Sequence, residues 1–128
     1  MPQDQTTGAA ANEFGRQTAR RLATAIGARI RGSGSNEADY QGRRIVIKCA
    51  RAATSSVGVT YRMLEHLHEV VGAFENANGA YELFALPAAE FVKHQRPTAS
   101  TGAAAGKVGL VSRTVFESQG RFLKRVVL

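Results

Sequence analysis

The chain has 128 residues, 44% of them hydrophobic, and a formal net charge of +7 at pH 7. This length supports one hydrophobic core rather than two, so we predict a single domain. No apolar run approaches the roughly 18 residues that a membrane-spanning helix needs, and a single cysteine, Cys49, excludes an internal disulfide. The first residues lack the basic and apolar segments of a secretory signal, which predicts a cytoplasmic protein without a membrane partner.

The elements predicted for the first half are a helix followed by two strands. Residues 1–11 are small and polar, which predicts a disordered tail before a domain that spans 12–128. Apolar residues at three- and four-residue intervals predict a helix that begins near Asn12 and ends at Gly27 or Gly32. The segments 37–40 and 44–50 then have strand character.

The second half is predicted to contain a helix, a strand and a second, shorter helix. Apolar spacing predicts a helix from Tyr61 to Phe74, a strand over 81–86 and a helix over 88–94. The small-residue stretch 98–106 is typical of a mobile loop. The last twenty residues fit either a helix or a hairpin that turns at Glu117–Gly120, and we favour the hairpin. This order predicts an α/β (α+β) fold, a mixed β-sheet flanked by helices.

The positive charge is concentrated in the first half of the chain. Ten Lys/Arg stand against four Asp/Glu up to Arg62, whereas seven stand against six from Met63 onward. A one-sided basic surplus on a small domain is typical of proteins that bind polyanions. The alternatives are a charge that serves solubility alone and a basic surface that binds an acidic protein.

Two common site types do not fit the sequence. The stretch 102–107 lacks the residues that a phosphate-binding loop needs before and after it. His66 and His68 are two residues apart, so on a helix they point about 200° from each other and cannot share a metal ion.

Asp39 and Lys48 are the residue types that metal-dependent phosphodiester hydrolysis uses. Carboxylates hold Mg²⁺, and a lysine stands by the attacking water or the phosphate. A two-residue turn at 41–42 pairs Asp39 with Arg44 and leaves Lys48 about 13 Å farther along the strand. A four-residue turn at 41–44 pairs Asp39 with Val46 and brings Lys48 to about 7–8 Å across the same face. A metal site at Asp39 therefore requires the longer turn.

The order and spacing of these features resemble the PD-(D/E)xK superfamily of restriction-endonuclease-like nucleases, from about Asn12 to Phe91. The resemblance implies a Mg²⁺- or Mn²⁺-dependent endonuclease of the restriction or repair type with a restriction-endonuclease-like core. Asp39 matches the family's aspartate, although Ala38 replaces the usual preceding proline, and Lys48 matches the family's lysine. Glu13 stands where a first-helix glutamate often helps to hold the metal or its water.

One departure from the family's pattern leaves two interpretations open. Val46 stands where the family has its second acid, so this carboxylate is either supplied by the following helix or lost. Glu65, or Glu69 one turn later, would supply it; Glu37 shares the face of Asp39 but is expected to lie farther from Lys48.

The first interpretation is a nuclease in which Asp39, Glu65 and Glu13 hold the metal and Lys48 stabilises charge on phosphorus. The second is a non-catalytic nucleic-acid-binding or assembly module on a degenerate nuclease fold.

The expected partner in both interpretations is nucleic acid. Six basic side chains are predicted to contact phosphates: Arg16, Arg20, Arg43, Arg44, Arg51 and Arg62. The resemblance implies DNA as the partner, and RNA is the alternative. Cleavage of both strands of a duplex by so small a domain would require two copies, so a homodimer is expected.

Overall fold

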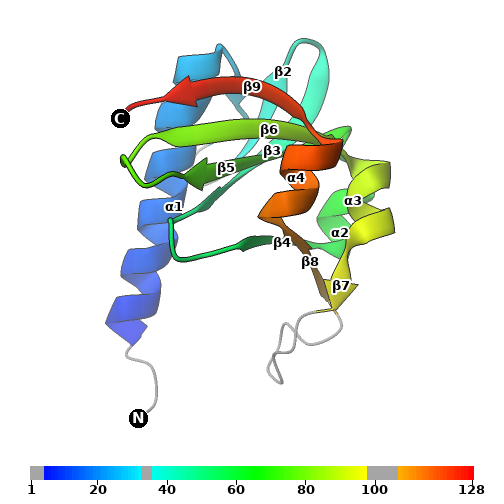
Figure 1. The fold of residues 1–128 in the computed structure, drawn as a ribbon, viewed down its shortest axis with the longest axis horizontal. Helices are drawn as coiled ribbons and strands as arrows, with labels where there is room; N and C mark the ends of the chain where they lie inside the picture. The colour runs from blue at the N-terminus through cyan, green and yellow to red at the C-terminus, as the bar shows by residue number, and fades with distance from the viewer. Residues whose placement is uncertain (1–4, 33–35, 98–106) are drawn as a thin grey trace.

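The computed structural model describes residues 5–32, 36–97 and 107–128, and for residues 5–13 it describes the backbone alone. The described residues form a six-stranded mixed sheet in the order β1-β2-β3-β5-β6-β9, a three-stranded sheet in the order β4-β8-β7, and four helices (Figure 1). The α/β class and the mixed sheet with flanking helices are thus confirmed.

The first helix, α1, spans Gln5–Ile26 and leads into the short strand β1, Arg29–Ile30. It begins seven residues before the predicted start at Asn12, and residues 1–4 lie outside the described part. The early turns are rich in small and polar residues and carry no apolar periodicity that could reveal a helix. Gly27 ends α1 with a φ of 78°, as predicted, because glycine adopts this left-handed conformation without steric cost.

Strands β2, Glu37–Tyr40, and β3, Arg43–Ala50, form a hairpin with a two-residue turn. The turn residues Gln41 and Gly42 have φ values of 51° and 77°, as a hairpin turn of type I′ requires. The four-residue turn on which a metal site at Asp39 depended is therefore wrong.

The chain then crosses to β5 through a second, smaller sheet. Strand β4, Ser56–Thr60, and the single-turn helix α2, Tyr61–Leu64, precede β5, Glu69–Glu75, which runs parallel to β3. The helix predicted over 61–74 is therefore wrong beyond its first turn. Strand β5 is buried on both faces, and a strand of this kind has a continuous apolar run that periodicity does not separate from a helix.

The rest of the chain continues both sheets. The predicted strand and short helix are confirmed as β6 and α3, but the region predicted as a hairpin turn forms a helix, α4, between two strands that belong to different sheets. Their bounds are β6 Tyr81–Pro87, α3 Ala88–His94, β7 Arg96–Pro97, β8 Val108–Ser112, α4 Arg113–Gln119 and β9 Arg121–Val126. The predicted mobile loop at 98–106 lies outside the described residues.

The six-stranded sheet carries a hydrophobic core on each face. Ile45 and Ile47 point from β3 toward α1, whereas the alternating Val46 and Ala50 point to the side that β4, α2, α3 and α4 cover. Figure 1 shows α1 apart from these three shorter helices, which lie together beyond the opposite side of the sheet. None of the helices in the described ranges is long and apolar enough to cross a membrane.

Candidate active site

Asp39 is not brought near Lys48. It lies opposite Arg44, and Lys48 is four residues farther along β3. Its two carboxylate oxygens accept hydrogen bonds from Nη1 of Arg31 at 2.9 and 3.0 Å, on a half-exposed edge of the sheet. The predicted pairing of Asp39 with Lys48 is thus wrong, because the shorter turn shifts the strand register by two residues.

The same shift brings Glu37 toward Lys48 instead. Glu37 lies directly opposite Val46, the position where the nuclease motif has its second acid. Lys48 follows two residues later and therefore shares that face of the sheet, diagonally about 7–8 Å from Glu37. The expectation that Glu37 lies farther than Asp39 from Lys48 is reversed.

Lys48 is largely withdrawn from water. Burial lowers the pKa of its ammonium group from the ordinary value of 10.5, because a poorly hydrated site disfavours the charged form. In the ranges that the structure covers, no carboxylate lies within ion-pair distance of this ammonium group. Lys48 is half-buried, and charges withdrawn from water are normally paired. A lysine in this position without a paired carboxylate is therefore a candidate functional residue.

Two histidines follow α2 in the irregular segment 65–68 rather than on the predicted helix. His68 fixes this segment to the start of β3: its backbone N–H donates to the Arg44 carbonyl at 2.8 Å, and its Nδ1 accepts from the Arg44 N–H at 2.9 Å. The segment thereby places Nε2 of His66 at 3.5 Å from Oε1 of Glu37. His66 thus joins the site from an element distant in sequence.

The other predicted acids do not gather around Asp39. Glu65 is exposed at the end of α2 and makes no side-chain hydrogen bond or ion pair with the described residues. Glu69 is buried and pairs with Arg43 at 3.3 Å and Arg121 at 3.2 Å. The side chain of Glu13 lies outside the described part. Within that part, no three His, Cys, Asp or Glu side chains are grouped as metal ligands.

The six predicted phosphate contacts are divided between opposite faces of the sheet. Arg20 lies on α1, beside a hollow of about 440 Å³, whereas Arg62 lies on α2, which covers the other face. Arg51 lies 4.0 Å above the ring of Phe14, and Arg43 is engaged by Glu69. Arg16 is exposed on α1, and Arg44 is half-buried. One flat surface therefore does not hold all six arginines.

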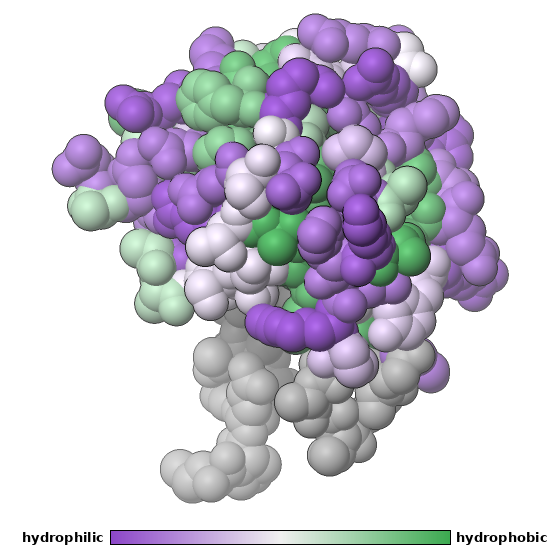
Figure 2. Space-filling model, turned by 45° about the vertical axis from the view of Figure 1, so that its right-hand side comes forward, coloured by the Kyte–Doolittle hydropathy of each residue, from purple (hydrophilic) through white to green (hydrophobic). Residues whose placement is uncertain are grey.

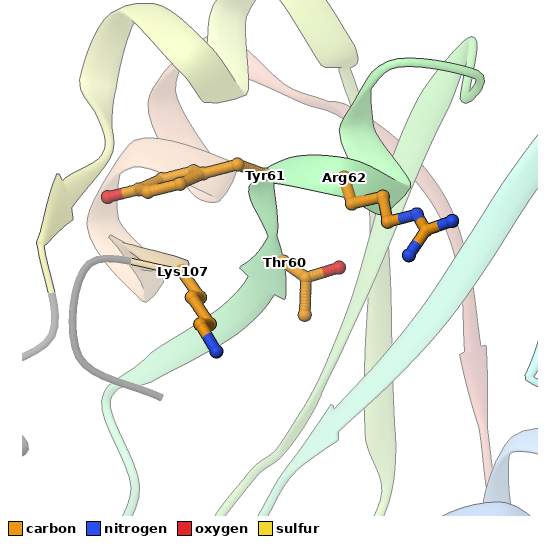
Figure 3. A pocket seen from close by; sticks show the side chains of 4 residues that line it. All are labelled: Thr60, Tyr61, Arg62 and Lys107. Atoms are coloured by element: carbon orange, nitrogen blue, oxygen red, sulfur yellow. The ribbon is translucent and has the colours of Figure 1, made fainter. Parts of the chain in front are cut away.

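A second hollow, of about 350 Å³, lies where α2 meets the start of β8, and it was not anticipated from the sequence. Thr60, Tyr61, Arg62 and Lys107 line it (Figure 3). Lys107 is separated from the other three by more than forty residues, so no local pattern indicated this grouping. Glu37 did have a local signal, because a glycine at the second turn position favours the two-residue turn that sets its register.

Comparison of the sequence with protein-family models gives no match, and comparison with curated proteins gives no significant similarity. A function for the chain is therefore inferred from the geometry described above.

Proposed function

We propose that this protein is a metal-dependent nuclease in which Glu37 takes the place predicted for Asp39. The observation that carries the proposal is the register of β2 and β3, which puts Glu37 opposite Val46 and diagonal to the half-buried Lys48. A carboxylate and a lysine on one face of a sheet are the pair that phosphodiester hydrolysis uses. As part of the same proposal, the six-stranded sheet and its helices correspond to the core of the PD-(D/E)xK nucleases.

A hard divalent cation at this site would need few ligands from the chain. Mg²⁺ at phosphate sites usually keeps several waters and takes one or two protein carboxylates together with substrate phosphates. Glu37 would supply one carboxylate, and His66 lies 3.5 Å from it. When bound, Mg²⁺ or Mn²⁺ would lower the pKa of a water molecule and so supply the nucleophile.

The chain's own residues have separate roles in this proposal. Lys48 donates hydrogen bonds to a non-bridging phosphate oxygen, and its withdrawal from water strengthens that interaction as negative charge develops. His66 orients the carboxylate of Glu37 from the side. Asp39 and Arg31 neutralise each other at the edge and have a structural role.

Cleavage of supercoiled plasmid and of single-stranded DNA with Mg²⁺ or Mn²⁺ tests the proposal. We expect Glu37→Gln and Lys48→Ala each to reduce the rate by about a hundredfold or more, the scale on which removing one electrostatic contributor acts. Asp39→Asn is the matched control on the same strand and face, and it should retain most of the activity. Loss of activity in Asp39→Asn with retention in Glu37→Gln would contradict the assignment.

A second candidate function is a non-catalytic nucleic-acid-binding module. It is favoured by Val46, which is fully buried in the core, so the motif's second acid is replaced by a packing residue. A wild-type protein that binds DNA or RNA with strong salt dependence, but cleaves neither with any divalent cation, would establish this function instead. If the protein is a nuclease that cleaves both strands of a duplex, we expect a homodimer. Sedimentation in the presence of DNA would detect this dimer.

A further inference from the structure

We infer that the hollow at the junction of α2 and β8 binds one unpaired nucleotide of a nucleic-acid strand, with its base against Tyr61 and its flanking phosphates at Lys107 and Arg62. This inference deepens the nucleic-acid binding in the proposed function and rests on it. It specifies the substrate class as single-stranded or locally unpaired nucleic acid.

The four lining side chains combine the two chemistries that such a site needs. Tyr61 offers a half-buried aromatic ring, and Arg62 and Lys107 are exposed cations. Proteins that hold single strands combine aromatic stacking of bases with basic groups along the backbone. Among the residues that the structure describes, no acidic side chain lines the hollow, so these walls would not repel the phosphates.

The arrangement of the cations suits a strand rather than a free anion. Figure 3 shows the Tyr61 ring and Lys107 on one side of Thr60 and the Arg62 side chain on the other. Two separated cations match a nucleotide within a strand, because such a nucleotide has a phosphate on each side of its sugar. A volume of about 350 Å³ is at the small end of ligand pockets and accommodates one unpaired base rather than a base pair.

The backbone holds the ring and the lysine in place. The Tyr61 N–H donates to the Lys107 carbonyl at 2.9 Å, which joins the start of α2 to the chain entering β8. Oγ1 of Thr60 accepts from the Met63 N–H at 3.1 Å and caps the turn that carries Arg62. Because the first of these contacts uses backbone atoms only, Tyr61 can be replaced without breaking it. In the view of Figure 2, hydrophilic residues surround interspersed hydrophobic ones on the face of the molecule that is shown.

The test compares a labelled oligothymidylate with an abasic oligonucleotide of equal length by fluorescence anisotropy at one salt concentration. The wild type should bind the oligothymidylate about tenfold more tightly, as one stacked base contributes. Tyr61→Ala should remove this difference and leave abasic binding unchanged, whereas Tyr61→Phe should preserve it because the ring remains. Arg62→Ala and Lys107→Ala should each lower the affinity for both oligonucleotides.

A second readout uses the absence of tryptophan from the sequence. In the variant Tyr61→Trp, the emission should be quenched by the oligothymidylate and not by the abasic strand. Equal binding of both strands by the wild type, or a Tyr61→Ala variant that keeps the difference, would overturn the inference while leaving nucleic-acid binding intact. A wild type that binds neither strand nor duplex would overturn the proposed function as well, so the two failures are distinguishable.

Discussion

Lys48 is expected to destabilise the fold that it serves. Its folded-state pKa lies below the ordinary value of 10.5, so between these two pKa values the unfolded chain binds more protons than the folded chain. The free energy of unfolding therefore rises with pH through that window, and at lower pH the full cost of burying the charge applies. Cys49 acts in the opposite sense at higher pH: burial raises the pKa of its thiol from 9.0 to about 12, so stability falls above 9.0 as the unfolded thiol ionises.

Replacing this lysine by an apolar side chain of similar length should stabilise the protein. We expect Lys48→Met to raise the free energy of unfolding at neutral pH by about 1–3 kcal/mol, the cost of a buried polar group without a partner. Urea unfolding at several pH values below 9.0 measures this change and should show a smaller rise with pH than in the wild type. The exposed Lys107→Met is the control, with an expected change within about 0.5 kcal/mol. A less stable Lys48→Met variant would mean that the lysine has a stabilising partner.

Among the elements, β5 depends on a glycine that lets aromatic rings approach the sheet. A Cβ atom on Gly72 would lie 2.6 Å from Cε2 of Phe74 and 3.0 Å from the ring of Phe116. These two rings pack edge to face with their centroids 5.3 Å apart, and Phe91 continues the cluster. Through Phe91 and Phe116, the helices α3 and α4 thus pack against β5. A residue larger than glycine at position 72 would collide with these rings.

The same substitution at two glycines should therefore have opposite effects. Gly72→Ala should lower the free energy of unfolding by about 1–3 kcal/mol, as overpacking of a filled core does. Gly15 lies on α1, and apart from its chain neighbours and the backbone of its own helix no described atom lies within 4 Å of an added Cβ. Gly15→Ala should therefore raise the free energy of unfolding by up to about 1 kcal/mol, because alanine favours helix. Midpoints of urea unfolding compare the two. Destabilisation by both would show that the surroundings of Gly15 are more crowded than described.

The sequence predicted these elements unevenly, and the physical causes differ. Strand β6 and helix α3 have clear local patterns and end at Pro87 and before Pro97, so they were predicted correctly. Strand β5 was taken for a helix because both of its faces are buried. The candidate site depended on the turn between β2 and β3, where a glutamine occupies a left-handed position that non-glycine residues seldom adopt. Residue types at the candidate site were therefore predictable, and Gly42 was the local signal for the turn length that decides which acid lies diagonal to Lys48.

At the scale of the whole molecule, several of the arginines are already engaged by acids. Arg31, Arg43 and Arg113 each form an ion pair with an acid, as do Arg121 and Arg125. Arg62 has no such partner among the residues described, and it lies exposed beside the Tyr61 hollow. Phosphate binding is accordingly expected to depend on arginines without an acidic partner, such as Arg62, more than on the total excess of basic residues in the first half of the chain.

Replacing Arg62 should affect nucleic-acid binding, whereas replacing Arg43 should affect only the stability of the fold. Removing Arg62 should weaken nucleic-acid binding and reduce the slope of log K against log salt by about one, because one phosphate contact is lost. Removing Arg43 should leave this slope unchanged. It should lower the free energy of unfolding by no more than about 1 kcal/mol, because the guanidinium of Arg43 is half-exposed and Arg121 still neutralises the buried Glu69 carboxylate. Salt titrations of Arg62→Ala and Arg43→Ala, each followed by urea unfolding, measure both quantities. If Arg43→Ala flattens the slope as Arg62→Ala does, the nucleic acid also reaches the β2–β3 hairpin, and the contact surface extends beyond the α2 side of the sheet.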